Sequence, residues 1–130
     1  MRILAIEDDA LNRRVVRDML AVAGVGMDEA DGAEVGLRMI DEDRYDVILM
    51  DLRMPGIDGM EAIGHIRARP APTNNLPVIV VTADAAEGLR DRCLDGGADE
   101  LLLKPVAMEE LFDAIGRVMA ARGLSAGLMF

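Results

Sequence analysis

Arg2-Ile-Leu-Ala-Ile-Glu-Asp8 is a short apolar run that ends on two carboxylates, and Tyr45-Asp-Val-Ile-Leu-Met-Asp51 repeats the pattern with one. If both runs are neighbouring strands of a parallel sheet, their carboxyl ends meet at one edge and three negative charges converge there. Repulsion between such charges favours protonation or a bound divalent cation. The two stretches therefore suggest a magnesium-dependent phosphoryl site at the edge of a parallel sheet.

Five short aliphatic runs alternate with five segments of helical period, which is typical of a parallel sheet covered on both faces. We expect an open, doubly wound α/β sheet, because closing a barrel needs more strands. Sheets of this kind bind ligands at the carboxyl ends of their strands. The expected strands span residues 2–6, 26–30, 47–50, 78–81 and 100–103, and the expected helices span 10–23, 33–42, 59–68, 86–94 and 107–122.

The first expected helix carries an apolar stripe at helical spacing, while most of its polar and charged residues lie elsewhere. This pattern predicts that the stripe packs against the sheet. Its members are Leu11, Val15, Val16, Met19, Leu20 and Ala23.

Composition narrows the class of protein. A length of 130 residues corresponds to about one domain. The formal charge of −10 argues against a nucleic-acid partner, since binding to phosphate backbones rests on clustered Lys and Arg. Cys93 is the only cysteine, so an internal disulfide is impossible. No apolar run approaches the roughly 20 residues of a membrane span, and no signal sequence precedes the first strand. These features predict a soluble, cytoplasmic protein without a membrane or nucleic-acid partner.

Four motifs at expected strand ends together resemble the CheY-like receiver domains of two-component response regulators. They are Ile6-Glu-Asp-Asp9, Leu49-Met-Asp-Leu-Arg-Met-Pro-Gly-Ile-Asp-Gly59, Val80-Val-Thr-Ala83 and Leu103-Lys-Pro105. The resemblance covers almost the whole chain, with residues 1–122 as the receiver domain and 123–130 as a C-terminal tail. It implies a flavodoxin-like sheet with strand order 2-1-3-4-5, the order of the doubly wound sheet in this family.

The resemblance implies separate roles for Glu7, Asp8 and Asp51 at the carboxyl edge of the sheet. Asp51 is the expected phosphoacceptor, and Mg²⁺ is the expected cofactor. Glu7, Asp8 and Asp51 would hold the ion, Asp8 directly and Glu7 through water, and the backbone carbonyl of Arg53 would complete the protein ligands. A divalent cation is needed because a carboxylate nucleophile must approach an anionic phosphoryl group.

Two further side chains have expected roles at this edge. Lys104 would place a compact positive charge on the phosphoryl oxygens, and Thr82 would supply a hydroxyl donor that also acts as a switch. Many receivers carry Tyr or Phe three residues before the lysine as the second half of that switch, whereas this chain has Leu101. Arg53 and Asp84 flank the site, and we expect them to form an ion pair that tunes dephosphorylation by controlling water access.

The end of the chain and one motif bear on output and partners. After the last expected helix only Gly123-Leu-Ser-Ala-Gly-Leu-Met-Phe130 remains, which predicts a single-domain regulator that signals through protein contact. Asn12-Arg13-Arg14 resembles hybrid-kinase receivers and single-domain regulators of the DivK type. The expected partners are a histidine kinase or a histidine phosphotransfer protein, and a downstream protein target.

Other classes of protein share parts of this pattern. A flavodoxin-like cofactor binder needs a phosphate loop after the first strand, where Glu7 and Asp8 would repel phosphate. A haloacid-dehalogenase-like phosphatase needs a second Asp at position 53, where this chain has Arg53. We therefore expect self-phosphorylation and self-dephosphorylation only, without turnover of an external substrate. A receiver-like interaction module that does not take phosphate stays open, as does a receiver segment working with a hybrid histidine kinase.

Overall fold

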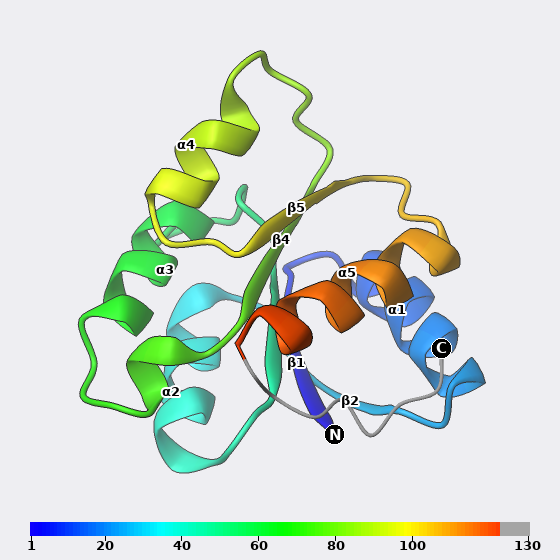
Figure 1. Cartoon of the computed structure of the whole chain (residues 1–130), viewed down its shortest axis with the longest axis horizontal. Helices are drawn as coiled ribbons and strands as arrows, with labels where there is room; N and C mark the ends of the chain where they lie inside the picture. The colour runs from blue at the N-terminus through cyan, green and yellow to red at the C-terminus, as the bar shows by residue number, and fades with distance from the viewer. Residues whose placement is uncertain (123–130) are drawn as a thin grey trace.

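A single parallel sheet of five strands forms the centre of the molecule (Figure 1). The computed structural model describes residues 1–122. The strand order is β2-β1-β3-β4-β5, and every neighbouring pair is parallel. The predicted flavodoxin-like fold is thereby confirmed. The strands are β1 (Arg2–Ile6), β2 (Gly26–Ala30), β3 (Val47–Met50), β4 (Val78–Thr82) and β5 (Glu100–Leu103).

Within residues 1–122, five α-helices cover the sheet on both faces, with α1 and α5 on one side and α2, α3 and α4 on the other (Figure 1). Each face has its own apolar core. Leu20 of α1 and Ile115 of α5 belong to one core, whereas Ile40 of α2, Ile63 of α3 and Cys93 of α4 belong to the other. The helices are α1 (Ala10–Val22), α2 (Ala33–Glu42), α3 (Gly59–Arg67), α4 (Leu89–Asp95) and α5 (Met108–Ala121), with a short 3₁₀ helix at Thr73–Asn75.

Helix α4 begins three residues later than predicted, at Leu89 and not at residue 86. The Asp84 carboxylate accepts a hydrogen bond from the backbone N–H of Ala86 at 2.9 Å, which holds this segment in a turn. Gly88 then caps the helix with a φ of +76°, a left-handed conformation that side chains disfavour. The connection between β4 and α4 is therefore longer than the helical period indicated.

The prediction that the whole α1 stripe packs against the sheet is wrong for its first turns. Leu11 is 67% exposed and Val15 is 44% exposed, whereas Leu20 is fully buried. A cavity of about 160 Å³ lies between this end of α1 and the β5–α5 connection, with Val15, Val16 and Val106 in its walls. Only the later part of the stripe reaches the core.

Paired charges hold the amino-terminal edge of the sheet. Asp99, just before β5, forms ion pairs with Arg67 of α3 at 3.1 Å and with Arg122 at 2.5 Å. At β1, Arg2 pairs with Asp28 and Asp43 at 2.9 and 2.5 Å. No helix within residues 1–122 is long and apolar enough to cross a membrane. The predicted tail, residues 123–130, lies outside the described residues.

Candidate phosphoryl and metal site

The register of the central strands brings the predicted acids together. Ile6 of β1 lies opposite Met50 of β3, so Glu7 and Asp51 leave the sheet side by side. The Asp51 N–H donates to the carbonyl of Ile6 at 3.0 Å, which extends the ladder to the site itself. Carboxylate oxygens of Glu7, Asp8 and Asp51 lie within 4.8 Å of one another. Glu7 and Asp51 are both buried, at 7% exposed, while Asp8 is exposed.

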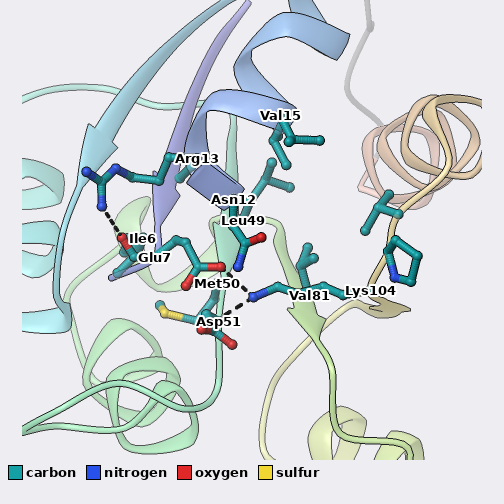
Figure 2. A pocket seen from close by; sticks show the side chains of 14 residues that line it. Ile6, Glu7, Asn12, Arg13, Val15, Leu49, Met50, Asp51, Val81 and Lys104 are labelled. Carbon is teal, nitrogen blue, oxygen red and sulfur yellow. Dashed lines mark hydrogen bonds and ion pairs between the residues drawn. The ribbon is translucent and has the colours of Figure 1, made fainter. Parts of the chain in front are cut away.

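Lys104 reaches this cluster from the carboxyl end of β5, the edge strand that lies beyond β4. Thr82 of β4 pairs with Leu103 of β5, and the Lys104 N–H donates to the Thr82 carbonyl at 2.8 Å. The lysine side chain then points toward the acids (Figure 2). Its Nζ donates a hydrogen bond to Glu7 Oε1 and lies 3.6 Å from Asp51 Oδ2. One ammonium group is thus shared between two buried carboxylates.

The cluster carries more negative charge than the lysine can neutralise. Burial, together with the neighbouring Asp51 carboxylate, raises the pKa of Glu7 in spite of the opposing Lys104 charge. Burial alone would lower the pKa of Lys104, but its hydrogen bond to Glu7 and the charge of Asp51 raise that pKa above the ordinary value. Oε2 of Glu7 is buried without a hydrogen-bond partner among residues 1–122. A divalent cation with a preference for oxygen ligands fits this excess charge and this unpaired oxygen.

Thr82 lies at the same edge, at the carboxyl end of β4. Its side chain is almost completely buried, at 1% exposed. The hydroxyl oxygen accepts a hydrogen bond from the Asp84 N–H at 3.2 Å. Thr82 is therefore fixed at the end of β4 by its hydroxyl group, and its carbonyl binds the backbone N–H of Lys104.

Arg53 and Asp84 form the ion pair that the sequence suggested. The Arg53 guanidinium donates to Asp84 Oδ2 at 2.5 Å, although the arginine side chain is 77% exposed. Hydrogen bonds from Arg53 and then from the Ala86 N–H lower the pKa of Asp84. The Arg53 N–H also lies 3.4 Å from Asp51 Oδ1. The Arg53 backbone thus lies beside Asp51, while metal binding by the Arg53 carbonyl stays a prediction.

Leu101 is half-buried on β5 and packs against the core that α2, α3 and α4 cover. A second cavity, of about 340 Å³, lies beside it. Leu89, Leu101, Leu103 and Asp84 are among its lining residues. A leucine in place of an aromatic therefore lies next to open space on the α4–β5–α5 face.

Gly59, the first residue of α3, is a site residue that sequence reasoning missed. A Cβ there would lie 2.3 Å from the Asp51 carbonyl oxygen and 2.8 Å from the Leu52 Cα, closer than real contacts allow. The Gly59 N–H donates to the Leu52 carbonyl at 3.0 Å, and the Asp58 carboxylate caps the helix by accepting from the Glu61 N–H. The signal was available, since glycine at a helix start directly after a capping Asp has no advantage for the helix itself.

Asp9 and Arg13 lie next to the acid cluster and bind backbone groups. Asp9 stays off the cluster and caps α1, where its carboxylate accepts from the N–H groups of Leu11 and Asn12 at 2.8 and 3.2 Å. Arg13, which the sequence left without a role, reaches the backbone carbonyl of Glu7 at 2.7 Å. The cavity of about 160 Å³ described above opens beside Asp51 and Lys104 (Figure 2).

The fold and the arrangement of this site agree with a known family. Residues 3–116 match the response regulator receiver domain family. The chain therefore belongs to the response regulator receiver domains of two-component signalling.

Individual relatives show how far the likeness extends. The chain is 37% identical over 115 residues to the response regulator MprA of Mycobacterium leprae, a match that covers 88% of this chain and 49% of that protein. It is 36% identical over 115 residues to the two-component response regulator ORR41 of Oryza sativa subsp. japonica, covering 85% and 88%. The chain thus spans about half the length of MprA.

A solved structure adds information on the site. The receiver domain of the sensor histidine kinase PA1611 from Pseudomonas aeruginosa is 34% identical, with a TM-score of 0.83 over 92% of this chain and 97% of that one. That structure has a magnesium ion coordinated in its active site cleft.

Proposed function

We propose that Asp51 accepts a phosphoryl group from the phosphohistidine of a histidine kinase or a histidine phosphotransfer protein, in a reaction that requires Mg²⁺. The observation that carries the proposal is the meeting of Glu7, Asp8 and Asp51 within 4.8 Å, with Lys104 Nζ 3.6 Å from Asp51. The magnesium ion found in the PA1611 receiver supports the choice of cation. Glu7, Asp8 and Asp51 would hold the ion.

The chemistry follows from the positions of the side chains. A carboxylate oxygen of Asp51 bonds to phosphorus, the bond between phosphorus and the donor imidazole nitrogen breaks, and that nitrogen keeps the electron pair and takes up a proton. Bound Mg²⁺ neutralises the charge that would otherwise keep phosphate away. Lys104 is placed to hold the phosphoryl oxygens through its ammonium group. Thr82 donates a hydrogen bond from its hydroxyl group to the phosphoryl group of the product.

The signal then leaves by protein contact. Phosphorylation draws Thr82 inward and shifts the population of packings on the face formed by α4, β5 and α5. Leu101 and its adjacent cavity of about 340 Å³ lie on this face. The size of the shift therefore depends on a leucine where many receivers use an aromatic ring. The receiver changes its own covalent state and has no external substrate.

A second candidate is a receiver segment that works with a hybrid histidine kinase. The specific observation in its favour is the 34% identity to the receiver domain of the sensor histidine kinase PA1611. The relatives reported above do not support the narrower DivK assignment. The single-domain organisation, the cytoplasmic location and the domain limits stay predictions.

The test is phosphorylation in vitro with a small phosphodonor such as acetyl phosphate, followed by intact mass spectrometry. Wild-type protein is expected to gain the mass of one phosphoryl group with Mg²⁺ and not with a chelator. Asp51→Asn is expected to gain none. Asp58→Asn is the matched control, because Asn keeps the cap of α3 and should leave phosphorylation intact.

Two results would contradict the proposal. The first is wild-type protein that gains no mass in the presence of Mg²⁺, which would favour the interaction module that does not take phosphate. The second is an equal gain of mass in Asp51→Asn, which would place the phosphoryl group on another residue.

A further inference from the structure

Arg13 approaches the acid site from the side opposite to Lys104 (Figure 2). Its Nη1 donates to the backbone carbonyl of Glu7 at 2.7 Å, and its Nε donates to Glu29 Oε1 at 3.1 Å. The Arg13 side chain is only 17% exposed. It therefore joins α1, β2 and the β1–α1 loop through a single guanidinium group.

The carbonyl that Arg13 binds belongs to the peptide group between Glu7 and Asp8. A peptide group is planar, so the direction of its carbonyl sets the orientation of the whole unit between the two Cα atoms. On the other side of Glu7, the backbone N–H donates to the Ala30 carbonyl at 3.0 Å. Hydrogen bonds thus fix the backbone on both sides of the Glu7 Cα. Ala30 accepts from the Glu7 N–H, and Arg13 donates to the Glu7 carbonyl.

We infer that Arg13 is a positioning residue for the metal site, which orients the Glu7–Asp8 peptide so that both carboxylates face Asp51. The inference rests on the metal site proposed above. Residues that orient metal ligands through hydrogen bonds typically change metal affinity by about 10- to 100-fold when removed. Arg13 would act on Mg²⁺ through the backbone, without touching the ion.

Charge and geometry make opposite predictions for Arg13, which makes the inference testable. As a nearby positive charge, the guanidinium opposes binding of a cation, so its removal would tighten Mg²⁺ binding. As a clamp on the peptide, it favours binding, so its removal would weaken it. The direction of the change in Kd separates the two effects.

Arg17 provides a matched control on the same helix. It lies one turn beyond Arg13 and donates from Nη1 to Glu29 Oε2 at 2.7 Å. Within the described residues its guanidinium bonds Glu29 alone, so Arg17 shares the ion pair with Glu29 but does not reach the Glu7 carbonyl.

The experiment compares wild type, Arg13→Met and Arg17→Met by titrating Mg²⁺ alone and following backbone amide shifts by NMR. Methionine keeps an apolar stem and removes the donors. Arg13→Met is expected to raise the Kd for Mg²⁺ by about 10-fold or more, while Arg17→Met stays within about twofold. Circular dichroism melts check that each variant is folded.

If Arg13→Met does not fold, Arg13→Lys replaces it, because a single ammonium nitrogen lacks the fork by which Nη1 and Nε of Arg13 reach the Glu7 carbonyl and Glu29. It is expected to raise the Kd severalfold. An unchanged or lower Kd in the folded Arg13 variant would overturn the inference, as would equal weakening in Arg17→Met. Wild-type protein that does not bind Mg²⁺ would overturn the proposed metal site and the role of Arg13 together.

Discussion

Replacing Gly59 with alanine should damage the site through its backbone. The added Cβ would lie 2.3 Å from the Asp51 carbonyl oxygen, so one side must retreat by about 1 Å to reach an ordinary contact of 3.4 Å. Neither side can move freely, because the Gly59 N–H is bonded to the Leu52 carbonyl and the Asp51 N–H to the Ile6 carbonyl. Overpacking of this kind costs about 1 to 3 kcal/mol of unfolding free energy.

Gly64, in the same helix, is the matched control. A Cβ at Gly64 meets nothing within 4 Å. Gly64→Ala should therefore raise the unfolding free energy by about 0.5 to 1 kcal/mol, the usual gain from replacing a helical glycine. The two alanine variants are expected to change stability in opposite directions.

The assay is urea denaturation followed by far-ultraviolet circular dichroism, since the chain has no tryptophan. Phosphorylation is measured in parallel by intact mass. Gly59→Ala should lower both the stability and the rate of phosphoryl gain on Asp51, because the displaced backbone carries the acceptor. If Gly59→Ala were as stable as Gly64→Ala and took phosphate at the wild-type rate, the close approach of α3 to Asp51 would be refuted.

Three other predictions concern charge. Since burial raises the pKa of Glu7, ionisation of Glu7 costs stability as pH rises through that pKa. Glu7→Gln should therefore raise the unfolding free energy at neutral pH and lose this advantage as pH falls toward the ordinary glutamate value of about 4.3; a constant advantage would contradict it. Mg²⁺ at about 100 times its Kd should raise the unfolding free energy of wild type by about 2.7 kcal/mol. The same Mg²⁺ concentration should stabilise Asp8→Asn less. Equal shifts of the melting temperature in both proteins would count against Asp8 as a ligand. Arg53→Ala and Asp84→Ala should change the lifetime of the aspartyl phosphate, measured by loss of the added mass, and unchanged lifetimes in both would reject their tuning role.

The parts of the site that the sequence predicted are those that depend on strand ends alone. Four of the five predicted strands carry a predicted site residue at or directly after their carboxyl end, as with Asp51 after β3 and Thr82 at the end of β4. In a parallel sheet the carboxyl ends of the strands lie at one edge. The hydrophobic periodicity of the sequence and the polar residues that follow each run are therefore enough to predict which side chains meet there. The strand positions and the acid cluster follow from this rule.

Other features depend on contacts that no local pattern reports. The late start of α4 follows from the turn at Asp84 and the left-handed Gly88, which override a helical period. The clamp by Arg13 exists because Glu29 lies one position before the end of β2, beside α1. Val15 is exposed beside a cavity between α1 and the β5–α5 connection, which a helical stripe does not describe.

The bond between Lys104 and Glu7 has a consequence for folding. It joins positions 97 residues apart, directly after strands β5 and β1, which are not neighbours in the sheet. A folding intermediate without β5 would gather the carboxylates with no ammonium group to oppose them, so their repulsion would disfavour it. Docking of the last strand relieves that repulsion, which makes the assembly of the first and last strands cooperative. The charge balance of the site thus depends on the docking of β5 beside β4.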